Sequence, residues 1–312
     1  MKDRYIIGID AGGTKVAYGL FCSKGKIIAR HQHTTDASAD GPAFSDTLIG
    51  NINILMKKNN LPFEKLDGVG VGMPSFIKSD AVYVFLTSAV TKIKDFAMRD
   101  YLEARLPVPV ILDNDANVAA LAEHRHGAGR GARHMVYVVM GTGFGSGIII
   151  DGKIFSGSYG AAGECGHMLA TPGEGLLCGC ENKGCYMSYV AGRLLPERVR
   201  HGLKSGIISK LTPETADGKK LLEAYKDDDP LAQKLIGEMA HNIACCLYNI
   251  YQMLNIDTYV FGGGLVNLGD VLFDRVYEEF GSYNHIPFPV HFKMAELRED
   301  IGIIGAAELV RS

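Results

Sequence analysis

The stretch Gly8-Ile9-Asp10-Ala11-Gly12-Gly13-Thr14-Lys15 lies between two apolar segments and puts an acid at the end of an expected strand. The paired glycines in the following turn let the backbone come close to a phosphate, with amide N–H groups and the Thr14 hydroxyl directed at its oxygens. Thr14 and Lys15 stand in the reverse of the P-loop order, and a strand rather than a helix is expected next. Taken alone, the stretch fits a phosphate-binding hairpin and a plain hairpin with a turn Asp equally well.

The segments around this stretch alternate between strand and helix patterns in both halves of the chain. Segment 157–184 has too few periodic apolar residues for regular structure, and a segment of that length is usually functional or braced by something other than a core. The pattern predicts an α/β fold of two similarly built lobes with a cleft between them. The expected strands are 4–10, 16–22, 26–31, 68–72, 108–112, 135–140, 147–150 and 258–261, and the expected helices are 42–59, 94–106, 115–127, 229–255 and 303–310.

The composition limits the class of protein. The chain has 312 residues, of which 47% are hydrophobic and 21% charged, and these values predict a globular protein with a sizeable core. The net charge of -3, without any basic block, disfavours a nucleic-acid partner. No apolar run has the length of a signal peptide or a membrane span, so we expect neither export nor a membrane partner. Three of the seven cysteines crowd between Cys178 and Cys185, which favours a reducing, cytoplasmic compartment over a disulfide framework.

Two further glycine clusters follow expected strands. Gly141-Thr142-Gly143-Phe144-Gly145-Ser146-Gly147 has GxGxGxG spacing, which does not fit the dinucleotide fingerprint. This is a second hairpin of the phosphate-binding type, at the start of the second half of the chain. Two such hairpins in one chain favour phosphate binding by both over two turns without a function. Gly262-Gly263-Gly264 would let a flat ring such as adenine lie close to bare backbone, although a simple strand-to-helix turn explains it as well.

An acidic motif, Leu112-Asp113-Asn114-Asp115-Ala116-Asn117, lies where a strand ends and a helix begins. Asp and Asn are favoured helix N-caps, so capping is a strong alternative explanation. Four such residues within five exceed the needs of one cap, however. A carboxylate at the carboxyl end of a strand is where a general base for a hydroxyl group is expected.

The sharpest signal is a group of metal-ligand residues. Glu164-Cys165-Gly166-His167 is followed by Cys178-Gly179-Cys180 and then by Cys185. One His and three Cys predict a closed tetrahedral zinc site that would brace the irregular segment. The alternative is a set of buried free cysteines.

These motifs, taken in order, resemble the ROK family (repressor, open reading frame, kinase) over nearly the whole chain. The resemblance implies an actin-like ATPase (RNase H-like) fold with the active site in an interlobe cleft. It implies a smaller lobe formed by 1–117 and 301–312, a larger lobe formed by 118–300 that holds the zinc segment, and a homodimer.

The resemblance also implies an ATP-dependent sugar kinase that uses Mg²⁺ and a structural Zn²⁺. Asp115 would be the base that accepts the proton of the sugar hydroxyl, expected to be the 6-hydroxyl of glucose or a related aldohexose. The other implied residues are those that hold ATP (Asp10, Gly12, Gly13, Thr14, Lys15, Thr142, Gly143, Gly263 and Gly264), those that contact the sugar (Asn114, Glu164 and His167) and those that ligate zinc (His167, Cys178, Cys180 and Cys185).

The chain departs from the family pattern in ways that bear on the sugar. The usual GCLE is here Gly184-Cys185-Tyr186-Met187, so Met187 replaces a sugar-contacting glutamate. Met73-Pro74-Ser75-Phe76 stands where a PGP-like turn is common, and the Asn-Leu sugar contact is not evident in 85–88. Polar contacts to hydroxyls carry much of the discrimination between sugars, so the usual substrate is disfavoured.

Three alternatives to a glucose kinase therefore stay open. One is a kinase for an unusual hexose such as allose or for an N-acetylhexosamine, and another is a non-catalytic sugar sensor. The last is a transcriptional repressor of the family, and such repressors carry a helix-turn-helix domain before the first phosphate strand. The sequence disfavours this alternative, because the residues before Arg4 leave no room for that domain.

Overall fold

The computed structural model describes residues 4–77 and 82–312. The first of its sheets contains β1 (Tyr5–Ala11), β2 (Lys15–Cys22), β3 (Ile27–Thr34), β4 (Leu66–Met73) and β8 (Val110–Asn114). The second contains β9 (Met135–Met140), β10 (Phe144–Ile150), β11 (Lys153–Ile154), β12 (Thr258–Gly262) and β13 (His291–Met294). A small sheet is formed by β5 (Ser75–Ile77), β6 (Val84–Thr87) and β7 (Lys94–Phe96). The helices are α1 (Gly41–Lys58), α2 (Met98–Glu103), α3 (Asp115–His126), α4 (Tyr186–Val190), α5 (Leu195–Lys204), α6 (Gly218–Lys226), α7 (Pro230–Leu254), α8 (Asp270–Tyr283) and α9 (Ile301–Arg311).

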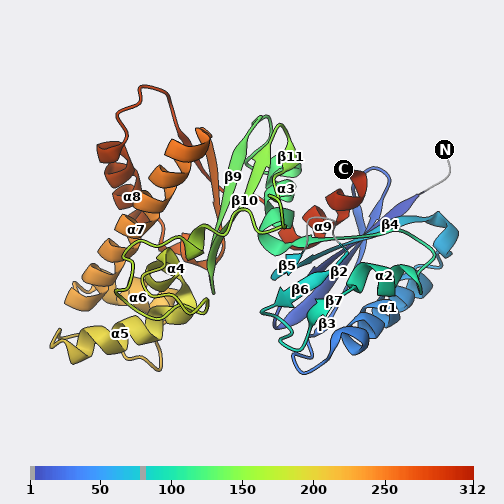
Figure 1. Ribbon diagram of the computed structural model, residues 1–312, viewed down its shortest axis with the longest axis horizontal. Coiled ribbons are helices and arrows are strands. Elements are labelled where there is room, and N and C mark those ends of the chain that lie inside the picture. Colours follow the sequence, from blue (N-terminus) through green and yellow to red (C-terminus); the bar gives the residue numbers. More distant parts are fainter. Residues whose placement is uncertain (1–3, 78–81) are drawn as a thin grey trace. The chain divides into compact units, whose positions relative to one another are not determined.

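The two large sheets have the same strand order (Figure 1). The first runs β3-β2-β1-β4-β8 and the second β11-β10-β9-β12-β13. In both, the strand that opens the half lies at the centre, with the next two strands of the chain on one side and later, parallel strands on the other. The predicted α/β class, with two similarly built halves, is confirmed.

The described chain forms two compact units. The first contains the residues up to Arg133, Gly147–Ala162 and Ala295–Ser312, and the second contains His134–Ser146 and Gly163–Met294. Helix α3 packs against α9 within the first unit. The division into lobes at residue 117 stays a prediction.

Side-chain alternation along β1 gives the first sheet two buried faces. Ile7 and Ile9 belong to the main core with the apolar residues of α1, whereas Ile6 packs with Ile303 and Ala307 of α9. Successive residues of a strand point to opposite faces, so a continuous apolar run predicts a strand covered on both sides. The helices α1 and α9 supply those covers.

Two strand glycines bring α9 unusually close to the sheet. A Cβ added at Gly8 would lie 2.0 Å from the carbonyl oxygen of Ile303, and one added at Gly70 would lie 1.7 Å from that of Ala306. Any side chain at either position would therefore push the helix away. The close approach fixes where the first turn of α9 lies relative to β1.

One expected helix is partly wrong. Residues 94–106 were expected to be helical, but Lys94–Phe96 forms β7, which pairs with β6, and α2 begins only at Met98. Asp95 has a φ of 45°, a left-handed conformation that a helix does not accommodate. The prediction for the irregular segment holds, because 157–184 consists of turns and isolated bridges apart from one short 3₁₀ helix, η2 (Cys165–His167).

No helix in residues 4–77 or 82–312 combines the length and apolar character needed to cross a membrane.

Candidate active site and metal centre

The acid of the first hairpin lies near the end of β1. Asp10 pairs with Ala17 of β2 on one side and with Gly72 of β4 on the other, and Gly72 in turn pairs with Asp113 of β8. Because β1, β4 and β8 are parallel, their carboxyl ends meet at one edge of the sheet. The register therefore brings Asp10 and the acidic motif of β8 to the same edge.

The turn after Asp10 is held by hydrogen bonds to its carbonyl groups. The Thr35 hydroxyl donates to the Gly12 oxygen at 2.7 Å, and the Thr35 N–H donates to the Thr14 oxygen at 3.0 Å. Gly13, Thr14 and Lys15 are exposed. The tip of the hairpin is thus exposed to solvent, and the hydrogen bonds from Thr35 hold the hairpin in place.

The start of α9 backs the Asp10 carboxylate. A Cβ added at Gly302 would lie 2.4 Å from the Asp10 carboxyl carbon, so only glycine fits there. The amino end of a helix favours a negative charge. Burial raises the pKa of Asp10, and the charge of Lys15 partly opposes that rise. Gly302 was not among the predicted site residues, because contacts between distant segments leave no local pattern.

The structure shows which residue of the acidic motif caps α3. The Asn114 side chain accepts a hydrogen bond from the Ala116 N–H at 2.8 Å and donates one to the Ser75 oxygen at 3.1 Å. Asp113 accepts from the Asn114 N–H and from the Asn117 amide. Asn114 is therefore the cap of α3, and Asp115 Oδ1 shares the Ala116 N–H with it at 2.9 Å.

Asp115 is the first residue of α3 and has a strongly perturbed carboxylate. Burial, together with the nearby charge of Asp10, raises its pKa to about 6. The residue is nevertheless exposed to solvent, so a reactant can reach it. A carboxylate that is accessible and more basic than usual is suited to accept a proton near neutral pH.

The second hairpin and the late glycines come together in the second unit. The Gly192 N–H donates to the Gly141 oxygen and the Arg193 N–H donates to the Thr142 oxygen, which braces the turn between β9 and β10. A Cβ added at Gly141 would lie 3.7 Å from the Gly264 nitrogen. Gly263 has a φ of 91° and lies against the Met140 carbonyl, where a side chain would clash. The structure thus joins two of the predicted nucleotide-binding turns.

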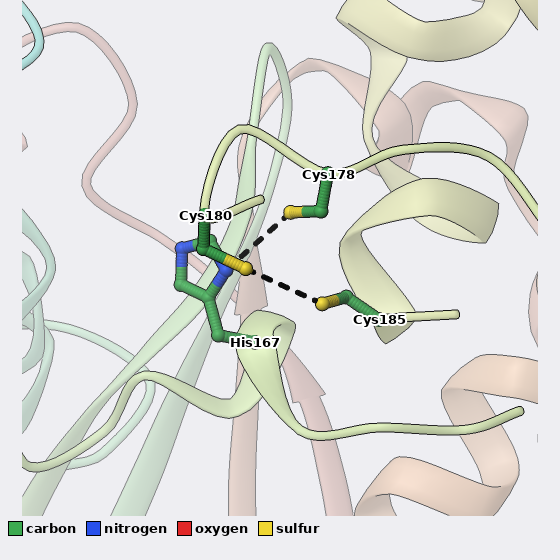
Figure 2. A group of neighbouring side chains, drawn as sticks. All are labelled: His167, Cys178, Cys180 and Cys185. Carbon is green, nitrogen blue, oxygen red and sulfur yellow. Dashed lines mark hydrogen bonds between the residues drawn. The ribbon is translucent and has the colours of Figure 1, made fainter. Parts of the chain in front are cut away.

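The four predicted zinc ligands also come together. One ligand atom from each of His167, Cys178, Cys180 and Cys185 lies within 4.8 Å of all the others. Figure 2 shows the imidazole and the three sulfurs turned toward one another, with Cys178 Sγ 3.5 Å from His167 Nδ1 and Cys180 Sγ 3.5 Å from Cys185 Sγ.

The protonation energetics of this cluster suit a cation. Burial, with the charge of Arg193, lowers the pKa of His167 and so favours the neutral imidazole that metals require. Burial and the two neighbouring thiols raise the pKa of Cys185 to about 12, a cost that a bound cation would relieve. The donor set of one nitrogen and three sulfurs fits Zn²⁺.

Glu164 stands at the start of the same turn. Its carboxylate Oε2 lies 3.9 Å from His167 Nε2, the ring nitrogen that faces away from the cysteines. His167 therefore has one nitrogen toward the cluster and the other toward Glu164.

Met187 makes a contact that the sequence did not predict. It is 7% exposed, and its sulfur accepts a hydrogen bond from the Phe144 N–H at 3.2 Å. A Cβ added at Gly166 would lie 3.0 Å from the Met187 methyl carbon, and one at Gly143 would lie 3.9 Å from its sulfur. Met187 thus fills the space between the second hairpin and the turn that carries Glu164 and His167.

Known proteins resemble this chain in sequence and in overall structure. The ROK family profile matches residues 6–312. A glucokinase from Streptomyces coelicolor is 30% identical, over 98% of this chain and 97% of its own length. An N-acetyl-D-glucosamine kinase from Photobacterium profundum is 32% identical, over 87% of this chain and 86% of its own. The solved structure of a ROK family glucokinase from Streptomyces griseus, in complex with glucose and AMPPNP, has a TM-score of 0.78 at 28% identity and covers 98% of this chain and 99% of that one.

Proposed function

The chain belongs to the ROK family, and from this premise we propose that it is an ATP-dependent kinase that transfers the γ-phosphate of ATP to a hexose hydroxyl. The observation that carries the proposal is the accessible, unusually basic Asp115 carboxylate at the sheet edge where Asp10 and the first hairpin also lie. Full-length relatives that are named as sugar kinases support it.

Asp115 is the general base. A pKa of about 6 leaves it ionised at neutral pH while making it a better proton acceptor than an ordinary carboxylate. It accepts the proton of the sugar hydroxyl as that oxygen attacks phosphorus. Asn114, whose side chain is fixed by Ala116 and Ser75, contacts the sugar beside it.

ATP is held by backbone amides of the glycine turns and by the Asp10 region. Asp10 orients the metal–phosphate end, and Gly12, Gly13, Thr14 and Lys15 contact the transferred group. The other phosphates lie on Thr142 and Gly143, and the adenosine lies on Gly263 and Gly264. Mg²⁺ supplies charge neutralisation on the phosphate oxygens, since phosphoryl transfer depends mainly on positioning and electrostatics.

His167 Nδ1 and the three cysteine sulfurs would hold Zn²⁺, and its role would be structural. Ligation through Nδ1 leaves His167 Nε2, beside Glu164, available to a sugar hydroxyl. The metal centre would then set the direction of two sugar contacts without touching the sugar itself.

The substrate that we propose is glucose or a related aldohexose, phosphorylated at the 6-hydroxyl. Met187 presents a thioether where the family pattern has a glutamate, and its sulfur is already engaged by Phe144. Loss of a carboxylate weakens the grip on one hydroxyl, which keeps a hexose that differs from glucose there, such as allose, or an N-acetylhexosamine, as the alternative substrate.

The decisive test is ADP release with Mg-ATP against a panel of aldohexoses, ketohexoses and acetamido sugars, with Asp115→Asn as the inactive control. Sugar-dependent turnover that the control lacks supports the kinase. Calorimetry with the same panel identifies the alternative: sugar binding without turnover would mean a sensor, and the kinase proposal would fall.

We also propose that the protein acts as a cytoplasmic homodimer. Light scattering coupled to size-exclusion chromatography measures the assembly directly. A mass near the 33.7 kDa of one chain, at the concentration used in the activity assay, would contradict the dimer.

A further inference from the structure

A second Cys–His cluster lies on α7 and α8, among residues that the proposed kinase site does not use. Cys245 Sγ lies 3.7 Å from His241 Nε2, and the two residues are one turn apart on α7. On the other side of the imidazole, Glu279 Oε2 of α8 lies 2.8 Å from His241 Nδ1. The Tyr283 hydroxyl completes the group, 3.9 Å from the Cys245 sulfur and 3.2 Å from Glu279 Oε2.

The distance between the sulfur and the nitrogen fits two ligands of one metal ion. Zn–S and Zn–N bonds of about 2.3 Å and about 2.0 Å, at a tetrahedral angle, place the two atoms about 3.5 Å apart. The predicted zinc cluster has a separation of 3.5 Å between Cys178 Sγ and His167 Nδ1.

Glu279 supplies the second feature of a metal-binding histidine. Such a residue almost always gives its other ring N–H to a carboxylate or carbonyl, which fixes the tautomer and the direction of the ligating nitrogen. With Nδ1 donating to Glu279, the Nε2 lone pair of His241 points toward Cys245. The tautomer and the orientation of the His241 imidazole thus already suit metal ligation.

We propose that Cys245 and His241 bind a thiophilic transition-metal ion of the Zn²⁺ type, with Glu279 as the positioning residue. The His241 side chain is 56% exposed and Cys245 is partly exposed, so the ion exchanges freely with solvent. Two protein ligands make this site weaker than one with four, and water completes the coordination.

The same three residues also have the order of a thiol nucleophile, a base and an orienting acid, as in cysteine hydrolases. A nucleophile of this kind needs no metal, whereas a ligand pair binds one, so the metal titration below distinguishes the two roles. The separation of Cys245 Sγ and His241 Nε2 is the observation that favours the ligand pair.

The test is a Zn²⁺ titration of the full chain against a chromophoric chelator, compared with variants of the cluster. We expect the wild type to bind one weak equivalent that is lost in Cys245→Ser and in His241→Gln. Glu279→Gln should weaken that equivalent about 10–100-fold, as expected for loss of a carboxylate behind a ligating histidine. Cys22→Ser, which removes another partly exposed thiol, is the matched control and should change nothing.

A Co²⁺ titration reports the ligand type, because thiolate coordination gives a near-ultraviolet charge-transfer band. A background with Cys178, Cys180 and Cys185 all changed to Ser removes the thiolates of the other cluster, so a remaining band that disappears in Cys245→Ser belongs to Cys245. Absence of that band, or a weak equivalent that persists in both Cys245→Ser and His241→Gln, would overturn the proposal. Neither readout depends on kinase activity.

Discussion

The strand end that carries Asp115 and the loop that carries His167 are held in place by different means. At the strand end, β8 pairs along its length with β4, and Asn114 caps α3. The loop is held instead by backbone hydrogen bonds of turns, such as those from the Ala170 N–H to the Gly184 oxygen and from the Cys178 N–H to the Asn182 oxygen, and by four side chains that converge. The base that we propose thus depends on backbone pairing, whereas the sugar contacts that we propose at Glu164 and His167 depend on the proposed metal cluster.

The largest effect should come from the strand end. Asp115→Asn removes the proton acceptor but keeps the side-chain shape, so kcat should fall about 10³-fold, within the range for general base catalysis. ATP binding should stay near the wild-type value, and the melting temperature should not fall, since Asn114 still caps the helix and the charge disfavoured by burial is gone. Steady-state kinetics with calorimetry checks this. A variant with more than a few per cent of the activity would show that another group is the base.

The loop should respond to loss of metal instead. Chelation of the zinc-loaded protein, or Cys180→Ser, should cost roughly 3 kcal/mol of stability and lower the melting temperature by several degrees, because loss of a metal belongs to the strongly destabilising changes. Hydrogen exchange should rise in 168–185 and stay unchanged in β8 and α3. Cys22→Ser is the control. An unchanged melting temperature on chelation would mean that the loop is held by its own packing.

A smaller effect is expected where a buried carboxylate, in place of a metal, anchors a loop. Glu123 of α3 is fully buried and accepts hydrogen bonds from the N–H groups of Ala128, Glu296 and Leu297. Glu123→Ala leaves these amides without their acceptor and should cost about 2 kcal/mol in denaturant unfolding. Glu123→Gln, which keeps one oxygen, should cost less. Equal stability of all three proteins would rule out this anchoring role.

The smallest effect concerns pH. With the pKa of Asp115 raised to about 6, protonation inactivates the base as pH falls, so kcat/KM should drop about tenfold per unit below that value. The stability contribution has the opposite sign: a raised carboxylate pKa favours the folded protein as pH falls from about 6 toward the ordinary value of 3.8. A pH–rate profile with its acidic limb near 4 would show that the base is an unperturbed carboxylate.

The sequence predicted the parts of the site that arise locally. The Asp10 hairpin and the acidic motif at Asp115 each combine a strand end with glycine or cap residues, and those signals are read within a few positions. The spacing of the Cys and His residues predicted that they cluster, because few arrangements other than a metal site bring four such ligands together.

The remaining features depend on contacts between distant segments. The contact of Gly302 with Asp10 and the hydrogen bond from Phe144 to Met187 join residues without any shared local pattern. The prediction of a helix at 94–106 was partly wrong because Asp95 adopts a left-handed conformation. An Asp residue permits this conformation but does not require it.

The close fit of α9 against β1 has a consequence for the order of events during synthesis. β1 is made first, yet its buried face and the Asp10 carboxylate are backed by Gly302 and its neighbours, which leave the ribosome after almost the whole of the chain. A nascent chain can complete the second unit while the first sheet still lacks this cover. The first unit therefore matures last, and until then the sheet face that carries Ile6 and Phe21 needs protection from other chains.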